Sequence, residues 1–199
     1  NCEYCLDVKN SLQSSQPFSM KIAECADFWQ DVHAKYGSGN IIITGGEPLL
    51  HPHFLDICSK IITYHRVTVR TNMSVDWQRL LELDFSKVTV EVSFHPVFSD
   101  PAAFLNSCLA LKRMGFALTI YCLAYPPFIA YLPVFMERCV GAGLTSTMTA
   151  FWGTYGKKRY PDCYTDGECR ILQPYLGTRE RICYNLHGSS HLFKIMSSF

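Results

Sequence analysis

The sequence predicts an α/β fold with parallel strands, and two kinds of pattern support this prediction. Five strand-like stretches recur at intervals of roughly 20 to 30 residues, and a helical stretch separates each from the next. The strands also alternate apolar and polar residues, whereas parallel strands buried on both faces read as continuous apolar runs. One face of the sheet is therefore expected to be wet or to line a site. A curved sheet or partial barrel with a polar lumen fits this pattern, and the intervening helices argue against an open antiparallel sheet.

The helices are predicted from apolar residues at helical spacing and from the residues that end each segment. They cover residues 19–36, 53–65, 77–83, 101–114 and 128–140. The strands follow from runs of β-branched and aromatic residues, and they cover residues 41–44, 67–73, 88–95, 116–125 and 144–151. Gly37 and Gly115 are placed to end two helices, and Pro126-Pro127 breaks the fourth strand.

The strand at 88–95 alternates strictly, so its polar residues are expected on the face that the helices do not cover. They are Thr89, Glu91, Ser93 and His95, and the matching set on the strand at 67–73 is Thr68, Arg70, Asn72 and Ser74. Arg70 and Glu91 lie at similar depths on neighbouring strands. They are predicted to form a structural ion pair in the barrel floor or, as the alternative, to bind opposite ends of a zwitterionic substrate.

The composition is that of a globular protein with one substantial core. The chain has 199 residues, of which 48% are hydrophobic and 18% are charged. The net charge of +1 gives no electrostatic argument for nucleic acid or an anionic membrane as a partner. No apolar run reaches the length needed to span a membrane.

The ten cysteines divide into two groups by their local sequence. The first group lies in predicted helices or strands and is expected to be small, buried and hydrophobic: Cys25, Cys58, Cys108, Cys122 and Cys139. The second group lies in loop-like sequence and is available for ligation: Cys2, Cys5, Cys163, Cys169 and Cys183. Alternating strands and helices do not suit a disulfide scaffold, and a reducing cytoplasm suits both groups.

The stretch Ile41–Pro52 joins a buried strand to a helix through Gly45, Gly46, Glu47 and Pro48. Two glycines permit a sharp turn or a close approach of another group to the backbone. Glu47 follows them at the carboxyl end of the strand, which is where α/β folds place their chemistry. A Gly-Gly-Glu-Pro sequence alone is consistent with either a functional site or an ordinary strand-to-helix turn.

The N-terminal residues contain Cys2 and Cys5, and such a pair alone could be a zinc half-site or a redox pair. Together with the Gly-Gly-Glu-Pro turn, however, it resembles the radical S-adenosylmethionine (radical SAM) superfamily, which binds a four-iron cluster through Cys-x-x-x-Cys-x-aromatic-Cys. Cys2, Tyr4 and Cys5 match the last part of that pattern. The first cysteine would precede residue 1, so the chain is expected to be an N-terminally truncated fragment. The resemblance covers roughly residues 1–150 and implies a partial (β/α)6 TIM-like barrel whose first strand is missing.

The resemblance also implies two cofactors, a [4Fe-4S] cluster and S-adenosylmethionine (SAM). Cys2 and Cys5 would ligate the cluster, and Tyr4 would lie near the adenine. Gly45, Gly46 and Glu47, with Pro48 in the same motif, would contact the methionine ammonium through backbone carbonyls and the carboxylate.

Three further residues lie at strand ends that face the expected lumen. Asn72 and Ser93 are expected to hydrogen-bond the SAM carboxylate or the ribose, or else to serve as simple turn formers. His95 is expected to contact SAM or substrate, or to be a surface turn histidine. The strand at 116–125 lacks the Gly-x-Ile-x-Gly-x-x-Glu pattern of the family, so the resemblance assigns no adenine contact there.

The tail changes character after residue 152, so the expected division is a radical SAM core over 1–152 and a cysteine-containing extension over 153–199. Many radical SAM enzymes carry an auxiliary cluster in such an extension. Cys163, Cys169 and Cys183 are candidate ligands for one, or unligated thiols, because their spacing does not match the usual pattern. The basic residues at 157–159 are expected to form a solvated loop.

The resemblance therefore predicts an enzyme that reductively cleaves SAM at the cluster and makes a 5′-deoxyadenosyl radical, which abstracts hydrogen from a substrate. The substrate is expected to be a small molecule or a peptide or protein, and the electron donor a protein such as flavodoxin or ferredoxin. The alternative is a non-catalytic zinc- or iron–sulfur-binding module that uses Cys2, Cys5 and the tail thiols structurally. A zinc clamp would have no need of Gly45-Gly46-Glu47 at the end of a strand.

Overall fold

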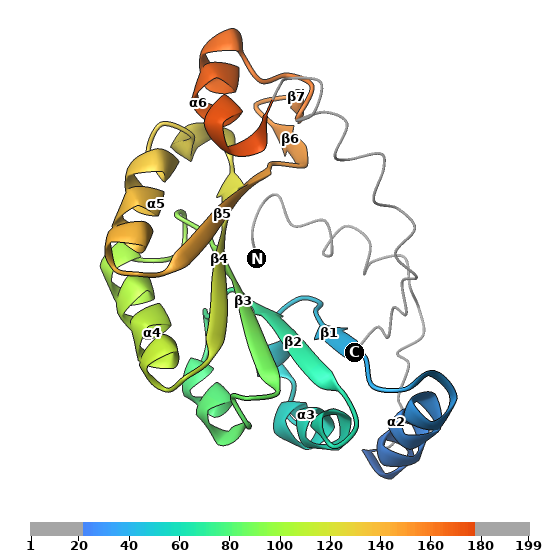
Figure 1. Ribbon diagram of the computed structural model, residues 1–199. Helices are drawn as coiled ribbons and strands as arrows, with labels where there is room; N and C mark the ends of the chain where they lie inside the picture. Colours follow the sequence, from blue (N-terminus) through green and yellow to red (C-terminus); the bar gives the residue numbers. More distant parts are fainter. Residues whose placement is uncertain (1–21, 178–199) are drawn as a thin grey trace. The chain divides into compact units, whose positions relative to one another are not determined.

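The computed structural model describes residues 22–177, which fall into two compact units. The described part of the N-terminal unit is residues 22–120, and that of the C-terminal unit is residues 121–177. The main sheet has five strands in the order β1-β2-β3-β4-β5, which is also their order in the chain (Figure 1). Among residues 22–177, no helix combines the length and the apolar character that crossing a bilayer requires.

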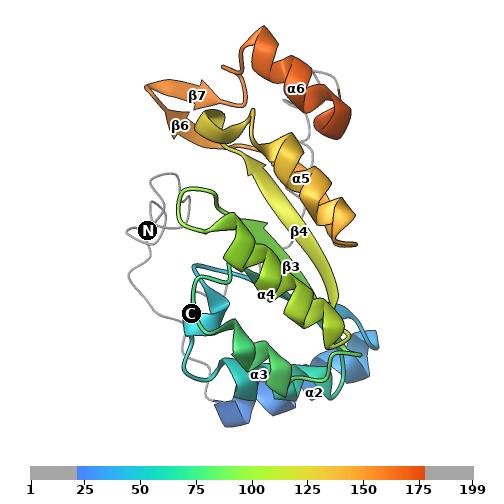
Figure 2. The ribbon, with the colours of Figure 1, turned by 90° about the vertical axis from the view of Figure 1, so that its left-hand side faces the viewer.

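The N-terminal unit is built on three parallel strands, β1 (Asn40–Ile43), β2 (Arg66–Thr71) and β3 (Val88–Phe94). Its helices are α2 (Ile22–Tyr36), α3 (Phe54–Ile62) and α4 (Pro101–Arg113), with the short 3-10 helices η1 (Pro48–Leu50) and η2 (Trp77–Glu82). Helices α3 and α4 lie on the same face of β2 and β3 (Figure 2). This arrangement leaves the other face of the strands to polar side chains.

The core of the N-terminal unit lies between these strands and helices. Buried side chains come from β2 and β3 (Val67, Val69, Val88, Val90, Val92), from α3 (Phe54, Cys58, Ile61) and from α4 (Phe104, Cys108, Leu111). In β3, apolar residues are buried and the polar residues between them are half-exposed, so the predicted alternation is confirmed. In β2 the prediction was wrong for Thr68, which is buried. Its hydroxyl exchanges hydrogen bonds with the side-chain amide of Asn40 on β1, and this pairing satisfies it inside the sheet.

The C-terminal unit begins within β4 (Ala117–Ala124) and continues through η3 (Pro126–Phe128), α5 (Leu132–Gly141) and β5 (Thr145–Ala150). A two-stranded antiparallel hairpin, β6 (Gly153–Tyr155) and β7 (Lys158–Tyr160), then leads to α6 (Asp166–Leu176). Tyr164 is buried there, and its hydroxyl donates to the Ala124 carbonyl and accepts from the Phe151 amide, each at 2.8 Å. Burial raises the pKa of Tyr164, so the phenol stays protonated and can donate.

The predicted α/β fold with parallel strands is confirmed, and the five strands begin and end within a residue or two of the predicted bounds. Four details differ, and the first is that the helix predicted over 53–65 spans only Phe54–Ile62. Residues 77–82 form a 3-10 helix, and α5 begins at Leu132 because the proline pair before it starts a separate 3-10 turn. Lys157 has a φ of +63° in the hairpin turn and Arg159 lies in β7, so the exposed basic residues belong to a hairpin instead of a loop.

The corner after strand β1, a candidate cofactor site

The chain leaves β1 through an exposed corner made of Thr44, Gly45 and Gly46. Gly45 has a φ of +151°, a backbone conformation that residues with a side chain rarely adopt. A Cβ atom built on Gly45 or Gly46 would meet nothing within 4 Å, so the backbone of both residues is open to approach. The corner lies at the carboxyl end of a parallel strand, the edge at which α/β sheets bind their ligands.

Glu47 uses both carboxylate oxygens within the protein. Oε1 accepts hydrogen bonds from the Leu49 amide (3.2 Å) and from the Thr71 hydroxyl (2.7 Å), and Oε2 accepts from the Asn72 amide (2.8 Å). Glu47 therefore caps η1 and ties the corner to the carboxyl end of β2. Pro48, at the first position of η1, fixes the backbone as it enters this short helix.

Arg79, on η2, holds the segment that follows the corner. Its Nη1 donates to the carbonyl oxygens of Leu49 and, at 3.3 Å, His51, and its Nη2 donates to that of Pro52 at 3.4 Å. The guanidinium also lies 5.7 Å from the centre of the Phe54 ring. The sequence analysis missed Arg79, because nothing in the local sequence of Trp77–Glu82 marks this residue.

The end of β2 is a tight turn that contains Asn72. The Asn72 side-chain oxygen accepts a hydrogen bond from the Ser74 amide (2.8 Å), and the Thr71 hydroxyl accepts one from the Met73 amide (2.9 Å). Met73 has a φ of +53°, which is uncommon for a residue other than glycine. Asn72 thus acts as a turn former, and its expected contact with SAM stays a prediction.

The end of β3 carries Ser93 and His95. Ser93 is half-exposed in the alternating strand. The His95 carbonyl accepts hydrogen bonds from the amides of Phe98 and Ser99, both at 3.0 Å, so the residue begins a turn. Burial lowers the pKa of His95, which favours a neutral imidazole near pH 7. Such a group can exchange hydrogen bonds with a ligand without adding a charge, and the expected contact with SAM or substrate stays a prediction for both residues.

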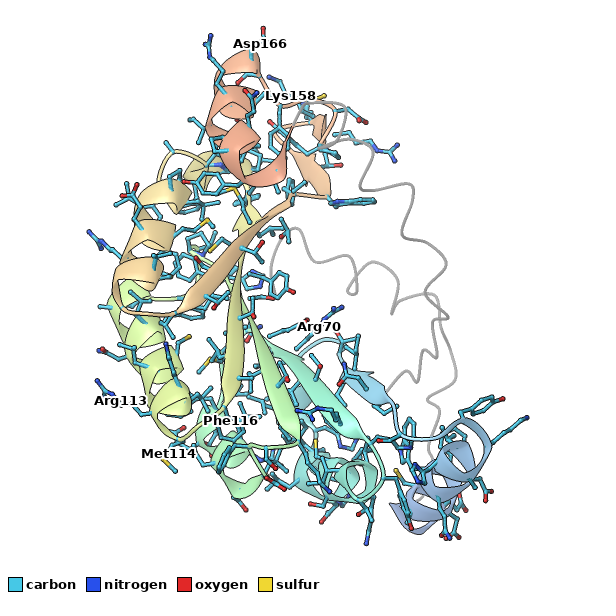
Figure 3. The ribbon with its side chains drawn as sticks, viewed as in Figure 1. Arg70, Arg113, Met114, Phe116, Lys158 and Asp166 are labelled. Carbon is cyan, nitrogen blue, oxygen red and sulfur yellow. The ribbon has the colours of Figure 1, made fainter. Side chains whose placement is uncertain are left out.

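Arg70 and Glu91 face each other across β2 and β3 in register, and Arg70 Nε donates to Glu91 Oε2 at 2.5 Å. Their side chains are 46% and 20% exposed, so solvent screens the pair. Arg70 projects from β2 on the side away from α4 (Figure 3). The ion-pair alternative is therefore realised in the folded chain, and a role in substrate binding stays a prediction.

The predicted cysteine groups have different outcomes. Cys25, Cys58, Cys108, Cys122 and Cys139 are all buried and free, as predicted. Burial raises the pKa of Cys58 to about 12 and that of Cys139 to about 11, so both thiols are inert at neutral pH. Cys2, Tyr4, Cys5 and Cys183 lie outside the described residues. Cys163 is exposed and Cys169 is half-buried, and residues 22–177 contain no group of three or more potential metal ligands.

Comparison with known proteins decides the family. The model of the radical SAM superfamily matches residues 1–117, which is more than half of the chain and contains both Cys2 and the Gly45–Glu47 corner. The chain belongs to the radical SAM superfamily. This is a superfamily of enzymes, so the predicted family and enzyme class are confirmed.

Several known proteins are similar to this radical SAM chain. It is 37% identical over 67 residues to the GTP 3′,8-cyclase of Acaryochloris marina (strain MBIC 11017), a match that covers 33% of the chain and 20% of the cyclase. It resembles the structure of anSMEcpe with bound AdoMet and a Kp18Cys peptide at a TM-score of 0.63 and 14% identity, covering 86% of the chain and 53% of that protein. It resembles Streptococcus suis SuiB at a TM-score of 0.60 and 14% identity, covering 84% of the chain and 42% of SuiB. These structural likenesses show the fold, and the chain spans about half or less of each relative.

Family membership implies SAM and a [4Fe-4S] cluster as cofactors, and the described part of the site fits SAM. The methionine part of SAM carries an ammonium group, which needs close hydrogen-bond acceptors. The open, exposed backbone at Gly45 and Gly46 offers carbonyl acceptors with no side chain in the way. The Glu47 carboxylate lies directly beside them but is already bonded to Leu49, Thr71 and Asn72. The corner therefore suits a cationic ligand whose ammonium group donates hydrogen bonds to the backbone carbonyls of Gly45 and Gly46.

Proposed function

We propose that the chain is the core of a radical SAM enzyme in which Cys2 and Cys5 ligate a [4Fe-4S] cluster and the Gly45–Glu47 corner binds SAM. The observation that carries this proposal is the open diglycine backbone at the carboxyl end of β1, held in place by Glu47 and lying inside the span that matches the family. Tyr4 contacts the adenine in this proposal. Such a corner has no use in a zinc clamp, so it favours the enzyme over the non-catalytic module.

Each residue of the corner has a distinct task in this proposal. The carbonyls of Gly45 and Gly46 accept hydrogen bonds from the methionine ammonium, which glycine allows because its backbone can be approached closely. Glu47 holds that backbone rigid and adds a negative charge near the cation, and Pro48 stiffens the exit. Asn72 bonds the SAM carboxylate or ribose through its side-chain NH₂ group, because its oxygen is occupied by the turn.

Ser93 and His95 line the same edge of the sheet, one strand further on, and bind SAM or substrate. With both cofactors bound, the cluster would supply an electron to the SAM sulfonium, releasing the 5′-deoxyadenosyl radical that abstracts hydrogen from a substrate. The electron would come from a protein donor such as a flavodoxin or ferredoxin.

A peptide or protein is the favoured substrate class over a small molecule. The support is that the fold resembles anSMEcpe with a bound peptide and SuiB bound to the precursor peptide SuiA. GTP 3′,8-cyclase, a match over one third of the chain, keeps a small-molecule substrate as the alternative. Arg70 and Glu91 would bind the substrate by breaking their mutual ion pair and pairing with its charged groups instead. A reducing compartment such as the cytoplasm suits such a cluster.

The central experiment is anaerobic reconstitution of the full-length protein with iron and sulfide, followed by reduction in the presence of SAM. The expected result is a brown protein with about four iron atoms per chain that produces 5′-deoxyadenosine. Cys5→Ala should lose the iron, whereas the buried control Cys108→Ala should keep it. A colourless protein that holds zinc and makes no 5′-deoxyadenosine would replace this proposal with the structural module.

We also propose the division into a radical SAM core over 1–152 and a cysteine-containing extension over 153–199. The support is the antiparallel hairpin that follows the main sheet from Gly153 onward. Whether Cys163, Cys169 and Cys183 hold an auxiliary cluster is decided by iron content. If they do, the wild-type protein should hold about eight iron atoms per chain and a triple serine variant about four; if they are unligated thiols, both proteins should hold about four.

A further inference from the structure

The corner after β1 is held from two sides by side chains of opposite charge. Glu47 ties it to β2 through Thr71 and Asn72. Arg79 ties the following segment to η2 through the carbonyl oxygens of three of the four residues from Leu49 to Pro52. A guanidinium presents five donors in a rigid fork, which a lysine ammonium on a flexible stem cannot reproduce.

The segment that carries Arg79 is packed into the core by buried side chains. The next residue, Leu80, is fully buried, and Leu83 at the end of η2 is 6% exposed. On the other side of the guanidinium, Leu49 is 2% exposed and Phe54, at the start of α3, is also 2% exposed. Arg79 therefore fastens residues 49–52, which follow the corner, to η2, and buried side chains lie on both sides of its guanidinium.

We propose that Arg79 is a positioning residue for SAM: it fixes residues 49–52, so that the Gly45 and Gly46 carbonyls keep the direction in which they meet the methionine ammonium. The inference rests on the proposed function, because it deepens the role of that same corner. It also assigns Glu47 a positioning role, since both of its carboxylate oxygens accept hydrogen bonds from the protein, from Leu49, Thr71 and Asn72. Neither side chain needs to touch the cofactor, and both act through the glycine backbone.

Two variants and one control test the proposal. Arg79→Ala removes the fork, and Arg79→Lys keeps the charge but loses the simultaneous bonds to three carbonyls. The control is Arg66→Ala, at the amino end of β2, where an exposed arginine donates to a single carbonyl, that of Ser86 at 3.2 Å. All are made in the full-length protein.

The first measurement is amide hydrogen exchange, which needs neither cluster nor SAM. The amides of Leu50, His51 and Phe54 lie in or next to the clamped segment, and they donate to the carbonyl oxygens of Glu47, Pro48 and His51 at 3.0 to 3.1 Å. They should exchange about tenfold faster in both Arg79 variants, while the amides of β3 keep their wild-type rates. The control should match the wild type throughout.

The second measurement is SAM binding and turnover in the reconstituted protein. The Kd for SAM should rise about tenfold in Arg79→Ala and somewhat less in Arg79→Lys, whereas 5′-deoxyadenosine formation at saturating SAM should stay within about twofold of wild type.

Wild-type protein that binds no SAM would overturn the proposed function. Wild-type protein that binds SAM, with unchanged Kd in the Arg79 variants, would overturn this inference alone. A uniform rise in exchange across β3 as well would also overturn it, because Arg79 would then stabilise the fold generally. If Arg79→Ala fails to fold, the same two measurements on Arg79→Lys test the inference.

Discussion

In two loop regions of the molecule, side chains hold the loop by hydrogen bonds to backbone groups. The side chains are charged in one region and neutral in the other. The corner after β1 is held by charged groups at a partly exposed edge, Glu47 and Arg79. The start of the tail is held by one neutral phenol, Tyr164, which is 2% exposed and bonds Ala124 and Phe151. A buried neutral side chain such as Tyr164 stabilises packing. Charged side chains at an open edge, such as Glu47 and Arg79, also shape the electrostatic field that a ligand meets. From this comparison we expect Tyr164 to matter mainly for stability and the corner to matter for the proposed binding of SAM.

The largest expected effect on stability is that of Tyr164→Phe. The change leaves a buried carbonyl on Ala124 and a buried amide on Phe151 without their partner, at about 1–3 kcal/mol for each group. Denaturant unfolding should therefore show a loss of about 2–6 kcal/mol. The SAM affinity of the folded protein should not change. A loss of affinity with unchanged stability would contradict the expected role of Tyr164 in stability.

The next effect is that of Glu47→Gln, which keeps the shape of the side chain but removes its charge. One carboxylate oxygen becomes an NH₂ group, so the bonds from Thr71 and Asn72 cannot both be accepted. We expect a loss of about 1–2 kcal/mol in unfolding free energy and a roughly tenfold weaker Kd for SAM. Titration of the reconstituted protein with SAM measures the second quantity. An unchanged Kd would mean that the corner keeps its geometry without the charge.

Structural features that depend on local periodicity could be predicted from the sequence. Contacts in which one side chain reaches a distant backbone group could not. The burial pattern of β3 and the five core cysteines followed from alternation and helical spacing. Arg79 and Tyr164 were missed because they bond to backbone groups 30 and 40 residues away, and no local pattern records such a contact. The hairpin at 153–160 was missed for another reason. Its turn has Lys157 at a positive φ, where asparagine or glycine is the usual signal.

A smaller effect is expected from pH through His95. Its pKa is lowered by burial, so the unfolded chain takes up a proton at a higher pH than the folded chain does. Its contribution to stability is therefore fully present above the unfolded value of about 6.5 and is lost as the pH falls through that value toward the folded pKa. Unfolding free energies measured at pH 8 and pH 5.5 should differ less in His95→Gln than in wild type. An equal pH dependence in the two proteins would show that His95 is as free to protonate in the folded chain as in the unfolded one.

The smallest effect on stability is expected for Arg70 and Glu91. Because Arg70 is 46% exposed, solvent screens the pair, and Arg70→Met or Glu91→Gln should change the unfolding free energy by less than about 1 kcal/mol. That small effect makes the pair a clean test of substrate binding, since any large change in activity cannot come from unfolding. If the pair binds a zwitterionic substrate, each variant should raise KM for that substrate about tenfold or more while SAM affinity and stability hold. Unchanged turnover in both variants would leave Arg70 and Glu91 as a cross-strand ion pair, and the binding chemistry at the carboxyl edge would then rest with the corner after β1 and the end of β3.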